Sequence, residues 1–254
     1  MLAFLYTVCY LFVFTVGICI GSFLNVLVYR IPNRIDFVRG RSFCPACGHS
    51  LGARDLVPLF SWLFLRGKCR YCGGRISPRY PIVELAGGGL ALLSCWRLGF
   101  TWVAAIAFAA CCILLTIALI DGDTQEIPDG LVIALAVLGV CSALMIGQGV
   151  WSERLFGAVC VSVPMVLMNL IVPTSFGGGD CKLMAAAGLL LGWRMTLLAT
   201  FLAVLTGGGY GAALLIRRKK GRKDHFAFGP FLAAGCAVAL FFGPGLLHWY
   251  LGLF

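Results

Sequence analysis

Two acidic motifs place carboxylates at the ends of long apolar segments. Asp121 directly follows the apolar run 102–120, and Asp180 follows the glycines Gly177, Gly178 and Gly179. A carboxylate at the edge of hydrocarbon is costly unless it is paired or hydrated, so both are candidate functional groups. Two carboxylates that converge on one water can share a proton, so that one activates the water and the other polarises a carbonyl. This chemistry is that of an aspartic peptidase.

Purely structural roles are the alternative for these acids. Asp180 can cap the helix that follows it, and Asp129 is expected to be a helix cap because it lies between Pro128 and a long apolar run. The three glycines before Asp180 favour a functional site over a simple helix cap, since a backbone without side chains permits the close approach of other groups. A phosphate-binding loop is a poor alternative, because the GxxxxGK[ST] pattern is absent.

Four of the 13 cysteines form two CxxC pairs that are separated by 21 residues. These four are Cys44, Cys47, Cys69 and Cys72. Four thiolates at this spacing suit a closed tetrahedral zinc site, which is structural because no coordination position stays open. Two redox motifs or unbound thiols are the alternatives. Gly48 and Gly73 follow the pairs, where we expect tight turns with positive φ.

The composition indicates which elements must position these residues. Hydrophobic residues make up 61% of the 254-residue chain and charged residues 12%, and the mean hydropathy is +0.97. These values exclude a soluble cytosolic enzyme, a disordered chain and a disulfide-rich module. We expect an all-α polytopic membrane protein with about eight transmembrane helices and a cytoplasmic zinc-binding loop between the first two. The expected spans are 2–28, 80–98, 102–120, 130–149, 155–173, 181–193, 195–216 and 227–250.

The segment 181–193 is short for a span, because 13 helical residues rise only about 20 Å. The predicted domains are a first transmembrane helix at 1–29, a four-cysteine zinc-binding loop at 30–79 and a seven-helix membrane domain at 80–254. No cleavable signal peptide is expected, because the first basic residue is Arg30.

The net charge of +10 is explained by membrane topology. Ten basic residues lie between Arg30 and Arg79, and six more lie within 217–223. With the N-terminus outside, both groups and both acidic motifs face the cytoplasm, which matches the positive-inside rule. The three basic residues expected outside are Arg97, Arg154 and Arg194. A nucleic-acid partner is therefore not needed to explain the charge.

The motifs, taken in order, resemble those of the bacterial type IV prepilin peptidases. Asp121 with Ile127-Pro128-Asp129 and the glycines with Asp180, Lys182 and Leu183 resemble the two catalytic motifs of that family. The cysteine pairs resemble its zinc-binding insert. The remaining matches are Gly21-Ser22-Phe23-Leu24-Asn25-Val26, Tyr29-Arg30-Ile31-Pro32, Arg79-Tyr80-Pro81-Ile82-Val83-Glu84 and Phe228-Gly229-Pro230-Phe231.

The resemblance implies that Asp121 and Asp180 form a catalytic dyad of the GxGD type. It implies a multi-pass protein of the bacterial inner membrane that removes a basic leader from prepilins or pseudopilins, after a glycine and at the cytoplasmic face. Family members with the cysteine loop commonly also N-methylate the new terminus with S-adenosylmethionine. No GxGxxG motif between strand and helix is present, so the residues of the donor site are unknown, and a contribution from the 30–79 loop is a hypothesis.

Three other functions are alternatives to this one. The chain could be a non-proteolytic binding protein or transporter with a zinc loop, although it shows no internal repeat. It could also be a methyltransferase without protease activity. A presenilin-like protease is disfavoured because the late Pro-Ala-Leu motif is absent. Glu84 is expected to contact the basic leader of a substrate or a neighbouring helix.

Overall fold

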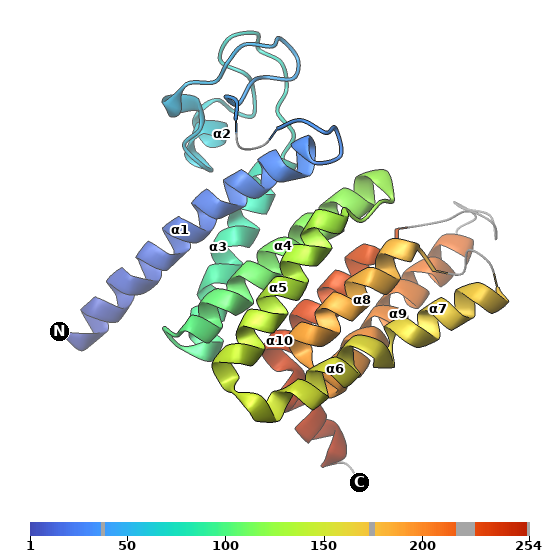
Figure 1. Ribbon diagram of the computed structural model, residues 1–254. Coiled ribbons are helices and arrows are strands. Elements are labelled where there is room, and N and C mark those ends of the chain that lie inside the picture. Colours follow the sequence, from blue (N-terminus) through green and yellow to red (C-terminus); the bar gives the residue numbers. More distant parts are fainter. Residues whose placement is uncertain (37–38, 173–175, 217–226, 253–254) are drawn as a thin grey trace. The chain divides into compact units, whose positions relative to one another are not determined.

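The computed structural model describes residues 1–36, 39–172, 176–216 and 227–252, and most of these residues are helical (Figure 1). The chain forms two compact units, Met1–Phe108 and Ala109–Phe254, which we describe separately. The basic cluster expected to mark a cytoplasmic loop at 217–223 lies outside the described residues.

The first unit is built on two antiparallel helices, α1 (Leu2–Arg30) and α3 (Arg79–Leu98), which lie side by side (Figure 1). Glycines allow the two backbones to approach closely. A Cβ atom on Gly87 would lie 2.5 Å from the carbonyl oxygen of Gly17 and 2.8 Å from the Cα of Gly21. Small residues at such contacts are typical of helices that associate in a membrane.

The segment between these helices contains two short helical pieces, η1 (Ala53–Asp55) and α2 (Phe60–Phe64). Side chains from both long helices hold it. Arg30 at the end of α1 donates to the carbonyl oxygens of Asp36 and Arg41, each at 2.9 Å. Glu84 of α3 accepts the backbone N–H of Leu59 at 2.7 Å. The expected alternatives for Glu84 were a substrate leader or a neighbouring helix, but its partner in this structure is the loop.

The second unit surrounds the short helix α8 (Gly178–Leu191), which packs against several other helices. Its neighbours are α5 (Asp129–Ile146), α6 (Trp151–Cys160), α7 (Ser162–Ile171), α9 (Trp193–Ile216) and α10 (Gly229–Leu251). The unit also contains α4 (Trp102–Thr124) from Ala109 onward and the 3-10 turn η2 (Gln148–Val150). The expected span 155–173 is divided between α6 and α7, because Pro164 has no N–H to bond the carbonyl of Cys160.

Arg154 explains how α8 can end after 14 residues. The last carbonyls of a helix have no partner within it. The Arg154 guanidinium donates to two of them, those of Leu189, at 2.8 Å, and Leu190, and also to Ser142 Oγ at 3.0 Å. The expected span 155–173 left Arg154 out, but this side chain is 7% exposed and lies within α6.

Among the residues that the structure describes, six helical segments are long and apolar enough to cross a membrane, which indicates an all-helical, multi-pass membrane protein. They are Phe4–Arg30, Trp102–Thr124, Asp129–Ile146, Trp151–Ile171, Trp193–Leu214 and Gly229–Leu251. The expectation of eight spans is not confirmed. The other two expected spans do form helices, but α8 has only 14 residues, and α3 contains Glu84 and Arg97 within an otherwise apolar run.

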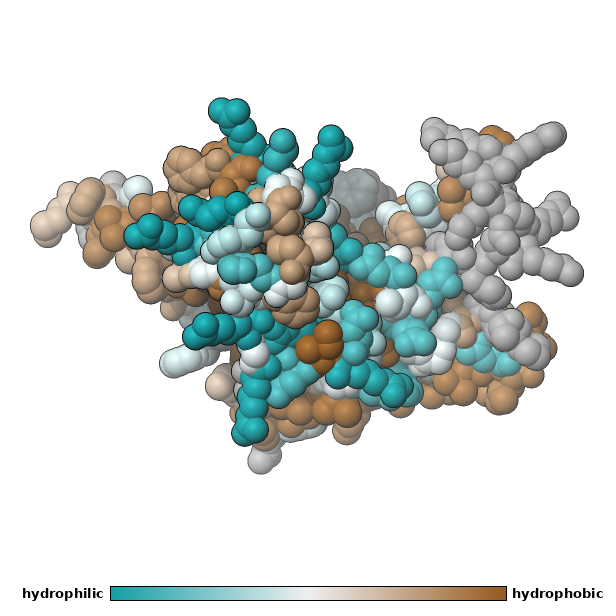
Figure 2. Space-filling model, turned by 90° about the horizontal axis from the view of Figure 1, so that it is seen from above, coloured by the Kyte–Doolittle hydropathy of each residue, from teal (hydrophilic) through white to brown (hydrophobic). Residues whose placement is uncertain are grey.

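The surface of the helices is rich in hydrophobic side chains. Phe4, Phe201 and Ile171 are 74%, 63% and 76% exposed. Figure 2 shows hydrophobic surface alongside a broad hydrophilic area on the face seen from above. Exposed apolar area of this extent fits contact with lipid.

The helix contact in the first unit makes a prediction about stability. Gly87→Ala should lower the unfolding temperature in detergent, because its Cβ meets the α1 backbone and overpacking costs about 1–3 kcal/mol. Gly89→Ala is the matched control on α3, because nothing lies within 4 Å of its Cβ. Equal shifts in the two variants would contradict this packing.

Candidate active site and metal centre

Asp121 lies on the last turn of α4 and is 5% exposed. Its Oδ2 accepts the backbone N–H of Gly229, the first residue of α10, at 2.9 Å. A Cβ on Gly229 would lie 2.6 Å from the same oxygen, so the contact requires glycine. The N-terminus of a helix also carries a partial positive charge, which favours a carboxylate there.

Asp180 is the third residue of α8 and is 7% exposed. Its Oδ2 accepts the N–H of Gly177, the residue that precedes the helix, at 3.2 Å. Asp180 therefore does form part of a cap, as the structural alternative expected. This role uses one carboxylate oxygen and leaves the other for chemistry.

The two carboxylates are close enough to influence each other. Burial raises the pKa of Asp180 to about 6, and the negative charge of Asp121 adds to the increase. Asp180 lies outside the six candidate spans. Within the described part of the chain, no buried side-chain oxygen or nitrogen lacks a partner, so the second oxygen of each carboxylate reaches accessible space. Such a pair can share one proton and bind one water between its members.

Contacts between the two motifs fix their relative position. A Cβ on Gly179 would lie 2.8 Å from the Cβ of Ile127, so this glycine allows the motifs to touch. Gly178 faces open space. The expectation that Asp129 caps a helix is wrong: it is the first residue of α5, Pro128 occupies the cap position, and its carboxylate pairs with Lys182 Nζ at 2.7 Å.

Sequence reasoning missed Asn169 on α7. Its side-chain amide donates to the carbonyl of Phe176 at 3.0 Å and accepts the N–H of Phe176 at 2.8 Å. This double contact holds the chain directly before the three glycines. A polar amide in an otherwise apolar helix was the signal available in the sequence. Gly229 was noted only as part of a motif, with no role.

The four cysteines of the two CxxC pairs come together in the first unit. Their Sγ atoms all lie within 4.8 Å of one another, and those of Cys44 and Cys72 are 4.0 Å apart. A tetrahedral zinc with bonds of about 2.3 Å needs sulfurs about 3.8 Å apart, so the donors fit this metal. Backbone N–H groups of Cys72 and Tyr71 directed at Cys69 lower its pKa to about 7, which favours the thiolate that binds metal.

The two knuckles have the same backbone design. In each, the residue before the first cysteine pairs with the residue three beyond the second, as Phe43 with Ser50 and Lys68 with Arg75. Gly48 and Gly73 have φ values of +71° and +69°, so the expected left-handed turns are confirmed. His49 lies next to the cluster, but its ring packs against Tyr71 at 3.7 Å between centroids.

Comparison with known proteins identifies the family. Residues 108–212 match the model of the type IV leader peptidase family, and residues 15–98 match that of the bacterial peptidase A24 N-terminal domain. A protein of Burkholderia pseudomallei (strain 1026b) is 34% identical over 264 residues, which cover 91% of this chain and 85% of the relative. The chain belongs to the type IV leader peptidase family.

Other family members match over similar lengths. A protein of Aeromonas salmonicida (strain A449) is 32% identical over 94% of this chain and 92% of its own. A protein of Bacillus subtilis (strain 168) is 32% identical over 95% of this chain and 96% of its own length. All three relatives are named prepilin leader peptidase/N-methyltransferase. No solved structure matches the chain.

The Gly229 contact predicts a large effect of one methyl group on this leader peptidase. If Asp121 is catalytic, as its motif predicts, Gly229→Ala should reduce substrate cleavage about 100-fold, because its Cβ displaces the Asp121 carboxylate and a misplaced catalytic group costs a rate of this order. Gly208→Ala is the control, because its Cβ meets nothing within 4 Å. Cleavage rates of the two purified variants decide the matter, and full activity of Gly229→Ala would contradict the arrangement.

The raised pKa of Asp180 predicts a pH-dependent stability. The folded chain keeps a proton on Asp180 up to about pH 6, whereas the unfolded chain loses it near pH 4. Stability should therefore fall as pH rises through this window, because the folded state binds more protons there. Asp180→Asn keeps an acceptor for the Gly177 N–H but does not titrate. Between pH 4 and 7, the free energy of unfolding of this variant should therefore rise relative to that of the wild type by on the order of 1–3 kcal/mol.

Unfolding temperatures of wild type and variant in detergent at several pH values provide the measurement. Asp123→Asn is the control, because this exposed residue lies on the same turn as Asp121. A difference between wild type and Asp180→Asn that does not change with pH would argue against a raised pKa.

Proposed function

We propose that this family member removes the leader of type IV prepilins or pseudopilins and N-methylates the new N-terminus. The observation that best supports the peptidase activity is the pair of buried carboxylates, Asp121 and Asp180. A backbone N–H holds each of them through one oxygen. The names of the relatives, which include both activities, support the same substrate class.

The peptidase step follows from the dyad. One carboxylate is ionised and removes a proton from a water, whose oxygen attacks the scissile carbonyl carbon. The other is protonated and donates a hydrogen bond to the carbonyl oxygen, which gains negative charge as the tetrahedral intermediate forms. When the C–N bond breaks, the proton taken from water passes to the leaving amine. The high pKa of Asp180 makes it the better proton holder.

The surroundings of the dyad suit this role. Asp121 and Asp180 sit at helix ends, where one face of each carboxylate meets protein and the other meets accessible space. A prepilin would present an apolar helix beside the apolar surface of this protein and a basic leader to its acidic motifs. We place this site at the cytoplasmic face of the bacterial inner membrane and cleavage after a glycine, as the resemblance of the motifs implies.

The cysteine cluster is proposed as a structural zinc site. Cys44, Cys47, Cys69 and Cys72 would hold the ion, and their closed set leaves it no open position for a substrate. The metal would cross-link two knuckles that otherwise have few backbone contacts. S-adenosylmethionine is the proposed donor of the methyl group. We keep the division into the first helix at 1–29, the four-cysteine loop at 30–79 and the membrane peptidase domain at 80–254 as part of this proposal.

Replacement of either aspartate tests the peptidase assignment. Asp121→Asn and Asp180→Asn should each abolish leader cleavage, because an amide can neither take a proton from water nor share one with its partner. Asp123→Asn, an exposed change two residues from Asp121, should retain activity. The measurement is the mass of a prepilin co-expressed with each variant.

The same masses separate the alternatives. A leader that is still removed by both Asn variants would exclude the dyad. A prepilin that gains a methyl group only after it is supplied in processed form would indicate a methyltransferase alone. A prepilin unchanged by wild type would favour the zinc-loop binding protein or transporter, which the family match does not support.

A further inference from the structure

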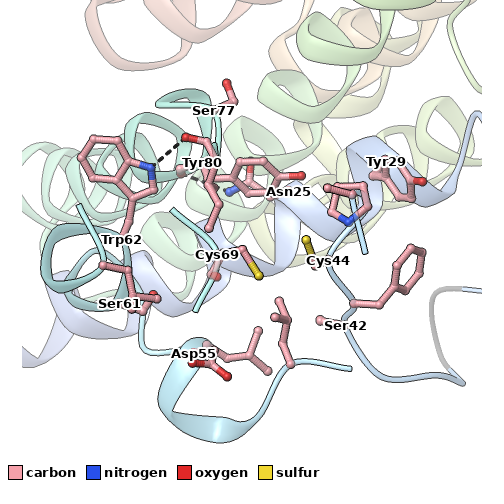
Figure 3. A pocket seen from close by; sticks show the side chains of 18 of the residues that line it. Asn25, Tyr29, Ser42, Cys44, Asp55, Ser61, Trp62, Cys69, Ser77 and Tyr80 are labelled. Carbon is pink, nitrogen blue, oxygen red and sulfur yellow. Dashed lines mark hydrogen bonds between the residues drawn. The ribbon is translucent and has the colours of Figure 1, made fainter. Parts of the chain in front are cut away.

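The first unit contains a cavity with a volume of about 420 Å³. Its walls come from the end of α1, the cysteine loop and the start of α3, as the close-up in Figure 3 shows. The acid Glu84 and the bases Arg30 and Arg70 all line it, so its charge does not select one class of ligand. Contacts in the second unit are more specific, because they end at the two carboxylates of the acidic motifs.

The side chain of Asn169 on α7 makes a two-point contact with the backbone of Phe176. Its Nδ2 donates to the Phe176 carbonyl oxygen at 3.0 Å, and its Oδ1 accepts the Phe176 N–H at 2.8 Å. Among uncharged side chains, only the amides of Asn and Gln present a donor and an acceptor side by side. Asn169 lies one helical turn after the buried Met165, so it is on the side of α7 that packs against protein.

The carbonyl held by Asn169 belongs to the same peptide group as the N–H that supports Asp180. The Phe176–Gly177 peptide bond is trans, so the group is planar and its carbonyl oxygen and N–H point in opposite directions. The oxygen accepts from Asn169 on one side, and the Gly177 N–H donates to Asp180 Oδ2 on the other, at 3.2 Å. Rotation of this plane would break both bonds together. Asn169 therefore fixes the direction in which the N–H meets Asp180.

The ring of Phe176 connects the same segment to the other carboxylate. It packs against the ring of Phe228, with 6.2 Å between the two centroids. Phe228 is the cap residue of α10 and directly precedes Gly229, whose N–H donates to Asp121 Oδ2 at 2.9 Å. Gly207 leaves room for the Phe228 ring, because a Cβ there would lie 2.8 Å from it. One held residue thus contacts the supports of both carboxylates.

We propose that Asn169 is a positioning residue of the peptidase, which acts through Phe176 to set the orientation of Asp180 and its distance from Asp121. This role rests on the proposed catalysis by the two aspartates and deepens it, since Asn169 acts on their supports and not on the substrate. Without its amide, the Phe176–Gly177 peptide group is free to turn, and Asp180 loses its N–H donor while the surrounding helices stay in place.

Asn169→Leu tests this role, because leucine has a similar size but neither donates nor accepts a hydrogen bond. It should lower kcat for leader cleavage about 10- to 100-fold and leave KM within about twofold, since a misplaced catalytic group costs rates of this order. Asn169→Gln keeps the amide on a longer side chain and should recover part of kcat. Leu170→Ala, an exposed change at the next residue of α7, is the control and should retain full activity.

The pH dependence of kcat/KM separates positioning from a loss of folded protein. Burial and the charge of Asp121 raise the pKa of Asp180, and the Gly177 N–H counteracts them. In Asn169→Leu this bond no longer favours the ionised form, so the alkaline limb, which reports loss of the shared proton, should move to higher pH. A smaller folded fraction would lower the rate equally at every pH and leave the limb in place.

The other titratable groups around this proton are not replaced by the substitution. They are Asp121 on α4, Cys181 on α8 and the exposed ion pair of Asp129 and Lys182.

Phe176→Leu tests the connection to Asp121. Leucine keeps the backbone groups that Asn169 binds but removes the ring contact with Phe228, so kcat should fall several-fold while the alkaline limb stays in place. Phe156→Leu is the matched control, because it removes a ring contact with Trp193, just beyond the far end of α8. Full kcat in Phe176→Leu would overturn the part of the proposal that concerns Asp121.

Full kcat in Asn169→Leu that unfolds cooperatively in detergent would overturn the role of this residue. A lower rate with an unshifted limb would indicate a structural effect only and would overturn it as well. If Asn169→Leu does not fold, Asn169→Gln provides the same test, with a smaller shift in the same direction. In each of these cases, wild-type cleavage that is abolished by Asp121→Asn leaves the proposed function standing. A wild type that does not cleave, or cleavage that survives Asp121→Asn, contradicts the proposed function itself.

Discussion

The second unit depends on keeping two carboxylates next to each other in surroundings that disfavour charge. Removal of water from Asp180 and the nearby charge of Asp121 both oppose ionisation. The fold offsets this cost with one backbone N–H for each carboxylate, donated by Gly229 and Gly177. Both donors are glycines at helix ends, so the same local geometry supplies a positive partial charge and room for close approach.

That requirement explains the arrangement of the helices around it. The N-terminus of α10 must reach the end of α4, and α8 must begin where those two meet. Two further contacts hold the start of α8 against the start of α5. They are the contact of Gly179 with Ile127 and the ion pair of Asp129 with Lys182. The ion pair is exposed, so its contribution to stability is small and its effect is mainly on orientation.

The sequence predicts local features well and distant contacts poorly. The spacing of the CxxC pairs and the glycines after them predict the cysteine cluster and its left-handed turns, because those geometries are set within four residues. The helices were predicted by hydropathy, but the break at Val161 and the shortness of α8 depend on Pro164 and on how Arg154 packs. The bond from Gly229 to Asp121 joins residues 108 positions apart, and no local pattern indicates it.

The same limit applies to the two sites. The acidic motifs were identified by their residue types, whereas the cavity beside the cysteines was not, because its walls come from three segments that are far apart in the sequence. The role of Asp121 and Asp180 in catalysis stays a prediction. The cysteine cluster and the two acidic motifs lie in separate compact units.

Arg154 has a mechanical consequence for this design. A helix of 14 residues is about 21 Å long, and its far end is tied through Leu189 and Leu190 to a guanidinium buried in α6. Sliding α8 along its axis, or turning it, would break both bonds within low-dielectric surroundings. The position of Asp180 along the helix axis is thus set from the opposite end of α8.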